Sequence, residues 1–339
     1  MSETQINHQI RLAARPVGPV KPSDWDMTEE PVAQPQPGQV LVQVVYLSLD
    51  PAMRGWLNDA RSYVPPVGIG EVMRALGAGR VIASESENVP VGAYVSGLLG
   101  VQEYATLDGA ALTVLDTNLA PLPTYLGALG MTGLTAYFGL LDIGRPKEGE
   151  TVLVSGAAGA VGGVAGQIAK LQGARAVGIA GGAEKCRYVT EELGFDAAID
   201  YKSANVMAAL SEHCPQGVDV YFDNVGGEIL DAALAHLARH ARVVICGAIS
   251  QYNATGAMRG PANYLSLLVN HASMTGFVVF DYAARYAEGV KALSEWVAAG
   301  KIATREEVIT GGIERFHETL MRLFEGANTG KLVLAVAEG

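Results

Sequence analysis

The chain has 339 residues, of which 49% are hydrophobic and 17% charged, and its formal net charge is −11. This length fits about two domains of ordinary size, and the apolar content is enough to give each one a buried core. The acidic balance argues against nucleic acid and anionic membranes as partners, because both require a basic face.

Membrane insertion, secretion and metal binding are not expected either. No apolar run approaches the roughly 18 residues of a membrane span, and residues 1–16 lack the apolar segment of a secretory signal. The cysteines (Cys186, Cys214, Cys246) are odd in number and far apart, so we expect no disulfide framework and a reducing cytoplasm. His236 and His240 are expected to share a helix face, but Leu237 stands where a zincin would have glutamate, so no metal is predicted.

The first part of the chain, from about residue 39 to 115, predicts a compact all-β unit. Short apolar stretches alternate with closely spaced proline and glycine, which is typical of strands joined by turns. The expected strands lie within 39–49, 77–84, 92–98 and 102–107.

From about residue 126, apolar strands alternate with helices. Val161, Val164, Ile168 and Leu171 recur at helical spacing. Such alternation with continuously apolar strands predicts a doubly wound parallel sheet covered on both faces. Strands are expected at 152–155, 174–181, 197–201, 217–223 and 241–250, and helices at 160–172, 183–194, 203–214, 229–238 and 286–297. The tail, from about residue 302, ends in a β-like segment that needs another sheet to join.

Three glycines mark the junction between the first of these strands and its helix. Gly156, Gly159 and Gly162 give the spacing GxxGxxG, a variant of the dinucleotide-binding loop. A bare backbone lets a phosphate approach, and the following helix directs its N-terminus at it. A tight turn with close helix packing is the simpler alternative, but the strand–loop–helix context favours dinucleotide binding.

The end of the second strand bears on the choice between NAD and NADP. An NAD-binding chain places an acid there for the ribose 2′-hydroxyl, whereas this chain has glycine at 181 and 182. Lys185 and Arg187 follow and are suited to a 2′-phosphate, with Tyr201 able to close the pocket. The residues favour NADPH, although Glu184 leaves NAD open.

Several motifs resemble one family throughout the chain. "YLSLDPAMRGW", the segment 131–173, "GGAEKCRYVTEELGFD", "YFDNVGGE", "CGAISQYNATG" and "NTGKLVLAV" resemble the zinc-independent medium-chain dehydrogenases/reductases. The branch is that of prostaglandin reductase, alkenal double-bond reductases and bacterial NADPH-dependent curcumin reductase. The resemblance implies a GroES-like β-rich domain at 1–124, a Rossmann NADP-binding domain at 125–301, and a segment 302–339 that returns its C-terminal strand to the first domain.

The resemblance also implies a set of cofactor-binding residues. The set comprises a pyrophosphate loop, a 2′-phosphate pocket and residues that hold the nicotinamide half. These are, in that order, Gly159, Ala160, Val161 and Gly162; Lys185 and Tyr201; and Asn224, Cys246, Gly247, Ala248, Ile249, Ser250, Tyr252, Phe277, Val278, Val279 and Asn328. Two positions depart from the pattern. Ala52 replaces an aromatic residue in "DPAMR", and Val269 replaces a tyrosine proposed as proton donor in some members, with Tyr264 five residues away and out of register.

The expected reaction is reduction of the carbon–carbon double bond of an α,β-unsaturated ketone or aldehyde. Carbonyl reduction needs zinc or a Tyr–Lys pair to polarise the oxygen, and the sequence offers neither. Hydride addition to the β-carbon gives an enolate, which needs only hydrogen-bond donors and a proton. Tyr252 and Tyr63 are the candidate catalytic donors, in an apolar cleft expected to include Met131 and residues 277–279. A zinc-independent quinone reductase and a non-enzymatic NADPH-binding protein remain alternatives. The resemblance further suggests a homodimer.

Overall fold

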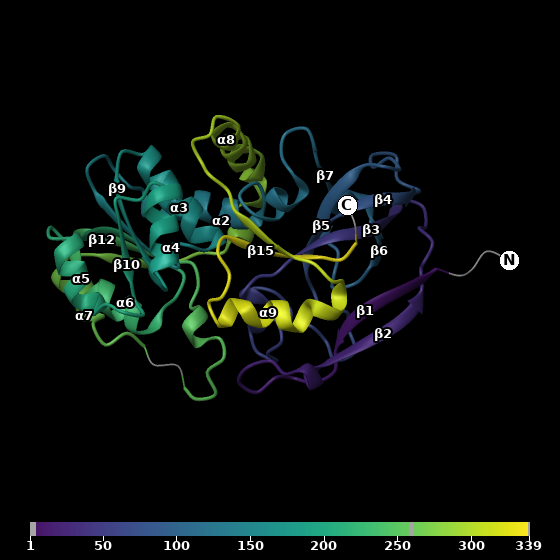
Figure 1. The fold of residues 1–339 in the computed structure, drawn as a ribbon, viewed down its shortest axis with the longest axis horizontal. Coiled ribbons are helices and arrows are strands. Elements are labelled where there is room, and N and C mark those ends of the chain that lie inside the picture. Colours follow the sequence, from purple (N-terminus) through teal and green to yellow (C-terminus); the bar gives the residue numbers. More distant parts are fainter. Residues whose placement is uncertain (1–4, 258–259, 338–339) are drawn as a thin grey trace. The chain divides into compact units, whose positions relative to one another are not determined.

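The structure is a computed structural model that describes residues 5–257 and 260–337. The chain forms two compact units, Met1–Leu126 with Glu306–Gly339 and Gly127–Arg305 (Figure 1). The sequence analysis expected the boundaries between the units after residues 124 and 301, and the structure has them after residues 126 and 305. Each unit is described by itself below.

The second unit is built on a six-stranded sheet whose strands are all parallel. In sheet order the strands are β10 (Ala197–Asp200), β9 (Arg175–Ala180), β8 (Thr151–Ser155), β11 (Val218–Asp223), β12 (Leu237–Ile245) and β13 (Ser273–Gly276). Numbered along the chain this is the order 3-2-1-4-5-6 of a Rossmann sheet. The strand order reverses between β8 and β11, and ligands of such sheets bind outside the carboxyl ends of the strands at that point. The predicted fold class is confirmed.

Helices follow most strands of this sheet, as the alternation in the sequence predicted. They are α2 (Met131–Phe138), α3 (Ala160–Leu171), α4 (Ala183–Arg187), α5 (Val206–His213), α6 (Gly227–Leu234), α7 (Leu265–Val269) and α8 (Tyr286–Ala298), with π-helical turns at Gly139–Gly144 and Tyr188–Glu192. The strand side chains are covered on both faces: the neighbouring pairs Leu153 with Tyr221 and Val154 with Phe222 point to opposite faces, and all four residues are 0% exposed. Burial on both faces explains why the strands are continuously apolar.

The helix expected at 229–238 is wrong at its C-terminal end. Helix α6 ends at Leu234, and β12 begins at Leu237. The cause is strand pairing: Leu237 pairs with Val218 of β11, whose N–H donates to the carbonyl of His236 at 2.8 Å. His236 therefore lies in the connection, and His240 lies in the strand with φ +63°. The two histidines do not share a helix face.

The first unit is rich in strands. A hairpin of β1 (Ile6–Leu12) and β2 (Trp25–Pro31) stands beside a seven-stranded sheet. This sheet has the order β14 (Glu306–Ile309), β15 (Lys331–Ala335), β3 (Gln39–Ser48), β4 (Leu76–Ser84), β5 (Tyr94–Leu98) and β7 (Thr113–Val114), with β6 (Tyr104–Asp108) also paired to β3. Two helices, α1 (Ala52–Gly55) and α9 (Phe316–Phe324), belong to the same unit.

The C-terminal strand completes this unit, as expected. Strand β15, drawn in yellow in Figure 1, pairs antiparallel with β3, with Val333 opposite Ser48. Lys331 at its start is 3% exposed, and its ammonium donates to the carbonyl of Leu49 at 2.9 Å and to Asp50 Oδ1 at 2.7 Å. A buried lysine that is paired with a carboxylate and a carbonyl in this way helps to fix the register of the returning strand.

Candidate functional site

The glycine loop lies at the switch point and is shaped by close backbone packing. Gly156 directly follows β8 with φ +61°, and Gly159 is the N-cap of α3. A Cβ at Gly162 would lie 2.3 Å from the carbonyl oxygen of Gly156, so only glycine allows the helix to begin this close to the loop. The N–H groups of the first turn of α3 have no partner within the helix. The loop and helix therefore present backbone donors suited to an anion.

The neighbouring strand β11 ends in a buried network centred on Asp223, which is 1% exposed. Its Oδ1 accepts hydrogen bonds from the hydroxyls of Ser155 and Tyr221 at 2.9 and 2.7 Å. The same oxygen accepts the N–H groups of residues 225 and 226, both at 3.0 Å. Burial raises the pKa of Tyr221 well above its ordinary value, which keeps this hydroxyl a donor. The carboxylate thus holds the turn after β11 to the end of β8.

Asn224 is fixed by this network. Its backbone N–H donates to Ser155 Oγ at 2.8 Å, and its side-chain Nδ2 donates to the Ser155 carbonyl at 2.7 Å. With the amide nitrogen engaged in this way, the side-chain position is set by the end of β8. Residue 224 therefore lies between the two strands that flank the switch point.

The segment that follows β12 folds against the same turn. Cys246 and Gly247 donate their N–H groups to the Asp223 carbonyl at 2.9 and 3.1 Å. Ser250 Oγ donates to the Val225 carbonyl at 2.6 Å. The Tyr252 hydroxyl accepts the N–H of Ala248 at 3.1 Å, which positions the phenol over this segment. The structure therefore brings together the predicted residues 224, 246–250 and 252 at one edge of the sheet.

Residues 277–279 follow β13 and are held by aromatic packing. The Phe277 ring lies 6.5 Å from that of Phe222, and a Cβ at Gly139 would lie 2.4 Å from it. These contacts fix the half-buried ring and with it the position of the segment. The Tyr286 hydroxyl donates to the Val279 carbonyl at 3.1 Å and lies 3.6 Å from Met131 Sδ, which places the expected residues Met131 and Val279 near each other.

The ends of β9 and β10 form the region expected to hold a 2′-phosphate. The Tyr201 ring lies against Gly181, where a Cβ would come within 2.8 Å of its Cε1. Lys185 lies on α4, the helix that begins directly after Gly182. Both residues predicted for this pocket therefore belong to neighbouring segments at the carboxyl edge of the sheet.

The remaining candidates lie in the β-rich unit or on the surface. Tyr63 is 53% exposed in the irregular segment that follows α1. Asn328 lies between α9 and β15, with its Nδ2 donating to the Gly330 carbonyl at 3.1 Å. Val269 and Tyr264, at and near the position of the absent tyrosine, are 74% and 58% exposed on and beside α7.

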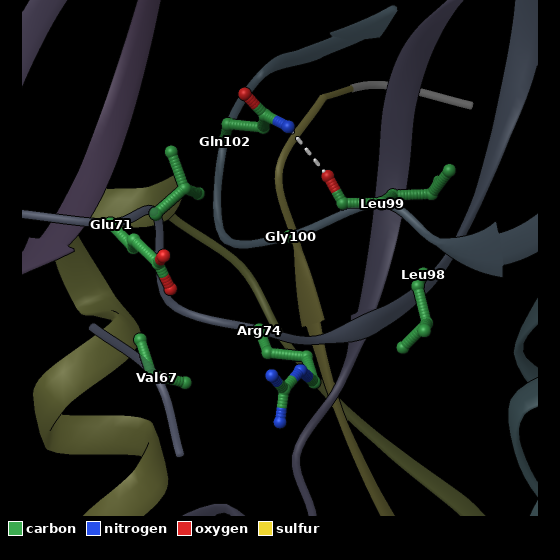
Figure 2. A pocket seen from close by; sticks show the side chains of 8 residues that line it. Val67, Glu71, Arg74, Leu98, Leu99, Gly100 and Gln102 are labelled. Carbon is green, nitrogen blue, oxygen red and sulfur yellow. Dashed lines mark hydrogen bonds between the residues drawn. The ribbon is translucent and has the colours of Figure 1, made fainter. Parts of the chain in front are cut away.

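The β-rich unit also has a pocket of about 300 Å³ (Figure 2). Glu71, Arg74 and Leu98 are among the residues that line it, and Gln102 Nε2 donates to the Leu99 carbonyl at 2.7 Å on one wall. Arg74 donates to the Pro65 carbonyl at 2.9 Å and lies over the Trp56 ring. Tyr63 is not among the lining residues, so this pocket is separate from the predicted donor.

The cysteines are unpaired and mostly unreactive. Burial raises the pKa of Cys214 to about 11 and that of Cys246 to about 12, so both are thiols at neutral pH. Within residues 5–257 and 260–337, no group of three His, Cys, Asp or Glu side chains is placed to hold a metal ion. In the same part of the chain no helix has both the length and the apolar character of a membrane span.

Sequence reasoning missed the residues that support the site. Ser155 and Asp223 tie the two central strands together, and Asp200 ties the end of β10 to the loop after β9. The available signal was an acidic residue ending an otherwise apolar strand, at positions 200 and 223. An acid in that place is well suited to accept backbone N–H groups at the edge of a sheet.

The sheet order, the glycine loop and the polar residues at the sheet edge define a protein with a Rossmann nucleotide-binding unit and a β-rich unit, and comparison with known proteins identifies the class as oxidoreductase. Residues 8–115 match a family described as the N-terminal domain of oxidoreductase, and residues 160–295 match one described as zinc-binding dehydrogenase. The chain belongs to the medium-chain dehydrogenase/reductase family, in the branch that contains curcumin reductase.

Three similar proteins illustrate the membership of the chain in this family. The NADP-dependent oxidoreductase YfmJ of Bacillus subtilis is 49% identical over 99% of both chains. The NADPH-dependent curcumin reductase of Escherichia coli is 44% identical over 99% of this chain and 98% of its own. The crystal structure of CurA from Vibrio vulnificus in complex with NADPH has a TM-score of 0.92 at 44% identity, covering 98% of this chain and 100% of that one.

Proposed function

We propose that the protein is an NADPH-dependent reductase of the carbon–carbon double bond of α,β-unsaturated ketones and aldehydes. The observation that carries the proposal is the 44% identity to curcumin reductase over nearly the whole of both chains. Curcumin contains double bonds conjugated to carbonyl groups, so its reduction belongs to this chemical class.

The residues present fit NADPH. The space left by Gly162 and the backbone donors that begin α3 suit a pyrophosphate, held by residues 159–162. Lys185 and Tyr201 are assigned to the 2′-phosphate. Asn224, residues 246–250 with Tyr252, residues 277–279 and Asn328 are assigned to the nicotinamide half. When bound, the cofactor supplies the hydride.

The chain's own residues then orient the substrate and provide a proton. Hydride arriving at the β-carbon moves the π electrons towards the carbonyl oxygen and leaves an enolate, whose α-carbon must be protonated. Tyr252 is the first candidate donor, because the Ala248 N–H fixes its hydroxyl beside the segment after β12. Tyr63 is the second, because its exposed phenol lies in a Pro/Gly-rich segment of the kind that often borders sites.

An acceptor panel tests this proposal against its rivals. The purified protein is mixed with NADPH and a simple enone, a 2-alkenal or a quinone, and nicotinamide absorbance is followed. Oxidation of NADPH by the enone and the alkenal supports the proposal. Oxidation by quinones alone identifies a quinone reductase, and tight NADPH binding without turnover identifies a binding protein.

We further propose that the reaction proceeds without zinc and that the protein works in the cytoplasm. Within the described residues no three His, Cys, Asp or Glu side chains gather as the ligands of a zinc site would have to. Unpaired cysteines fit a reducing compartment. Retention of full turnover after dialysis against a chelator is the expected result, and loss of turnover restored by zinc would contradict it.

The assembly proposed is a homodimer. Strand β13 ends the parallel sheet, and its outer edge pairs with no other strand in the described part of the chain. Leu268 and Val269 on α7, the helix that precedes it, are 75% and 74% exposed. Exposed strand edges and apolar surface of this kind are suited to a second copy of the chain. Sedimentation velocity at micromolar concentration is expected to give a dimer, and a monomer would contradict the assignment.

A further inference from the structure

We infer that Lys202, a residue outside the predicted pocket, supplies a second cation to the 2′-phosphate of NADPH and thereby contributes to the choice of NADPH over NADH. The inference rests on the proposed function, and it adds a specificity-determining residue to the same site. It follows from how the ends of β9 and β10 meet.

The Lys202 side chain lies over the end of β9. A Cβ at Gly181 would come within 3.0 Å of Cε of Lys202 and within 2.8 Å of Cε1 of Tyr201. The ammonium nitrogen is one bond beyond that Cε. The lysine and the tyrosine therefore share the space above Gly181, and the tyrosine is already assigned to the 2′-phosphate.

The position of Lys202 is set by Asp200 at the end of β10. Asp200 Oδ1 accepts the N–H of Gly182 at 2.7 Å and the N–H of Lys202 at 3.0 Å, and its Oδ2 accepts the Ser203 hydroxyl at 2.8 Å. These hydrogen bonds lower the pKa of Asp200 below its ordinary value, and the bond from the Gly182 N–H has the largest effect. One carboxylate thus connects the loop after β9 to the backbone of Lys202.

Asp200 differs in position from the acid of an NAD site. In NAD-binding sheets that acid stands at the end of the second strand and accepts the ribose 2′-hydroxyl, whereas Asp200 ends β10, the third strand of this sheet along the chain, and accepts three hydrogen bonds from the protein. Lys202 Nζ makes no ion pair with any described acidic side chain within 4.0 Å, so its charge is available to a ligand.

The charge of the ligand calls for more than one cation. A phosphate monoester carries roughly −1.5 to −2 charges at neutral pH. Lys185 provides one positive charge, and Glu184 stands beside it on the exposed face of α4. A second lysine, from the turn that follows β10, offsets part of the negative charge that Lys185 alone leaves uncompensated.

Binding measurements on Lys202→Met and Lys202→Arg test the inference. Dissociation constants for NADPH, NADH, 2′,5′-ADP and 5′-AMP are measured by calorimetry. Methionine keeps the aliphatic stem and removes the charge, so it is expected to weaken NADPH and 2′,5′-ADP about tenfold and to leave NADH and 5′-AMP within about twofold. Arginine is expected to retain the preference, and the defect of the methionine variant is expected to shrink as salt is raised.

Lys291→Met, which changes an exposed lysine of α8, is the matched control. If Lys202→Met behaves like this control while the wild type prefers NADPH and reduces enones, the inference is wrong and the proposed function stands. If both cofactors weaken equally, Lys202 is a structural residue and the inference is also wrong. If the wild type binds NADPH no better than NADH and reduces no enone, the proposed function fails as well.

Discussion

Replacing Gly162 by alanine tests whether the close approach of α3 to the glycine loop is needed. The added Cβ would lie 2.3 Å from the Gly156 oxygen, 2.8 Å from the Gly156 carbonyl carbon and 3.1 Å from Ala157 Cα. All three atoms belong to the backbone, so no side chain can rotate away. An ordinary contact of this kind begins near 3.4 Å, and the helix start must therefore shift by roughly 1 Å.

Two effects are expected from this shift. Overpacking of this kind costs about 1–3 kcal/mol of unfolding free energy. The backbone donors at 160–162 also move relative to the rest of the loop, and a misplacement of about 1 Å can lower function as much as a hundredfold. NADPH affinity is therefore expected to fall by about tenfold to a hundredfold.

Gly163→Ala in the same helix is the matched control. Its Cβ would meet the flexible Leu193 Cδ1 at 3.0 Å and the Ala157 oxygen only at 3.4 Å. In a helix interior, alanine also stabilises the helix by about 1 kcal/mol relative to glycine. Urea unfolding gives the stability of both variants, and fluorescence titration gives their NADPH affinity. Wild-type affinity and stability in Gly162→Ala would refute the argument that this backbone contact shapes the site.

The other predictions concern the cofactor, the proton donors and pH. Lys185→Ala is expected to weaken NADPH by about 1–3 kcal/mol with NADH little changed; calorimetry measures both, and equal loss for both would mean that the lysine only supports α4. Tyr252→Phe or Tyr63→Phe is expected to lower turnover roughly a hundredfold at unchanged NADPH affinity if that hydroxyl serves the enolate; full turnover in both single variants and in the double variant would leave the cofactor ribose and solvent as proton sources. Because the folded-state pKa of Asp200 is lowered, chiefly by the Gly182 N–H, its stabilising effect is complete above the unfolded pKa of about 3.9 and is lost as the pH falls through the folded value. The difference in unfolding free energy between wild type and Asp200→Asn is therefore expected to shrink as the pH falls from about 5 to about 3, and a constant difference would contradict this role.

Much of the parallel sheet could be predicted from the sequence, because strands buried on both faces must be apolar along their whole length. The glycine loop was visible for a related reason: Gly156 needs a positive φ and Gly162 tolerates no Cβ. The returning C-terminal strand was expected because an apolar strand after the last helix needs a partner.

Other features depend on tertiary contacts that no local pattern records. The hairpin of β1 and β2 carries many polar residues and shows no clear alternation, so its strands were not predicted. The predicted end of the helix at residue 238 was wrong because pairing of β12 with β11 overrides the helical tendency of residues 235–238. Lys202 was missed because its closeness to Gly181 depends on β10 lying next to β9 in the sheet.

The position of hydride delivery tests the central claim most directly. The protein is incubated with NADPH deuterated at C4 of the nicotinamide and with an aryl enone such as 4-phenylbut-3-en-2-one, and the product is analysed by NMR. The account predicts the saturated ketone with deuterium on the β-carbon and an intact carbonyl group. An allylic alcohol with deuterium on the former carbonyl carbon would contradict it.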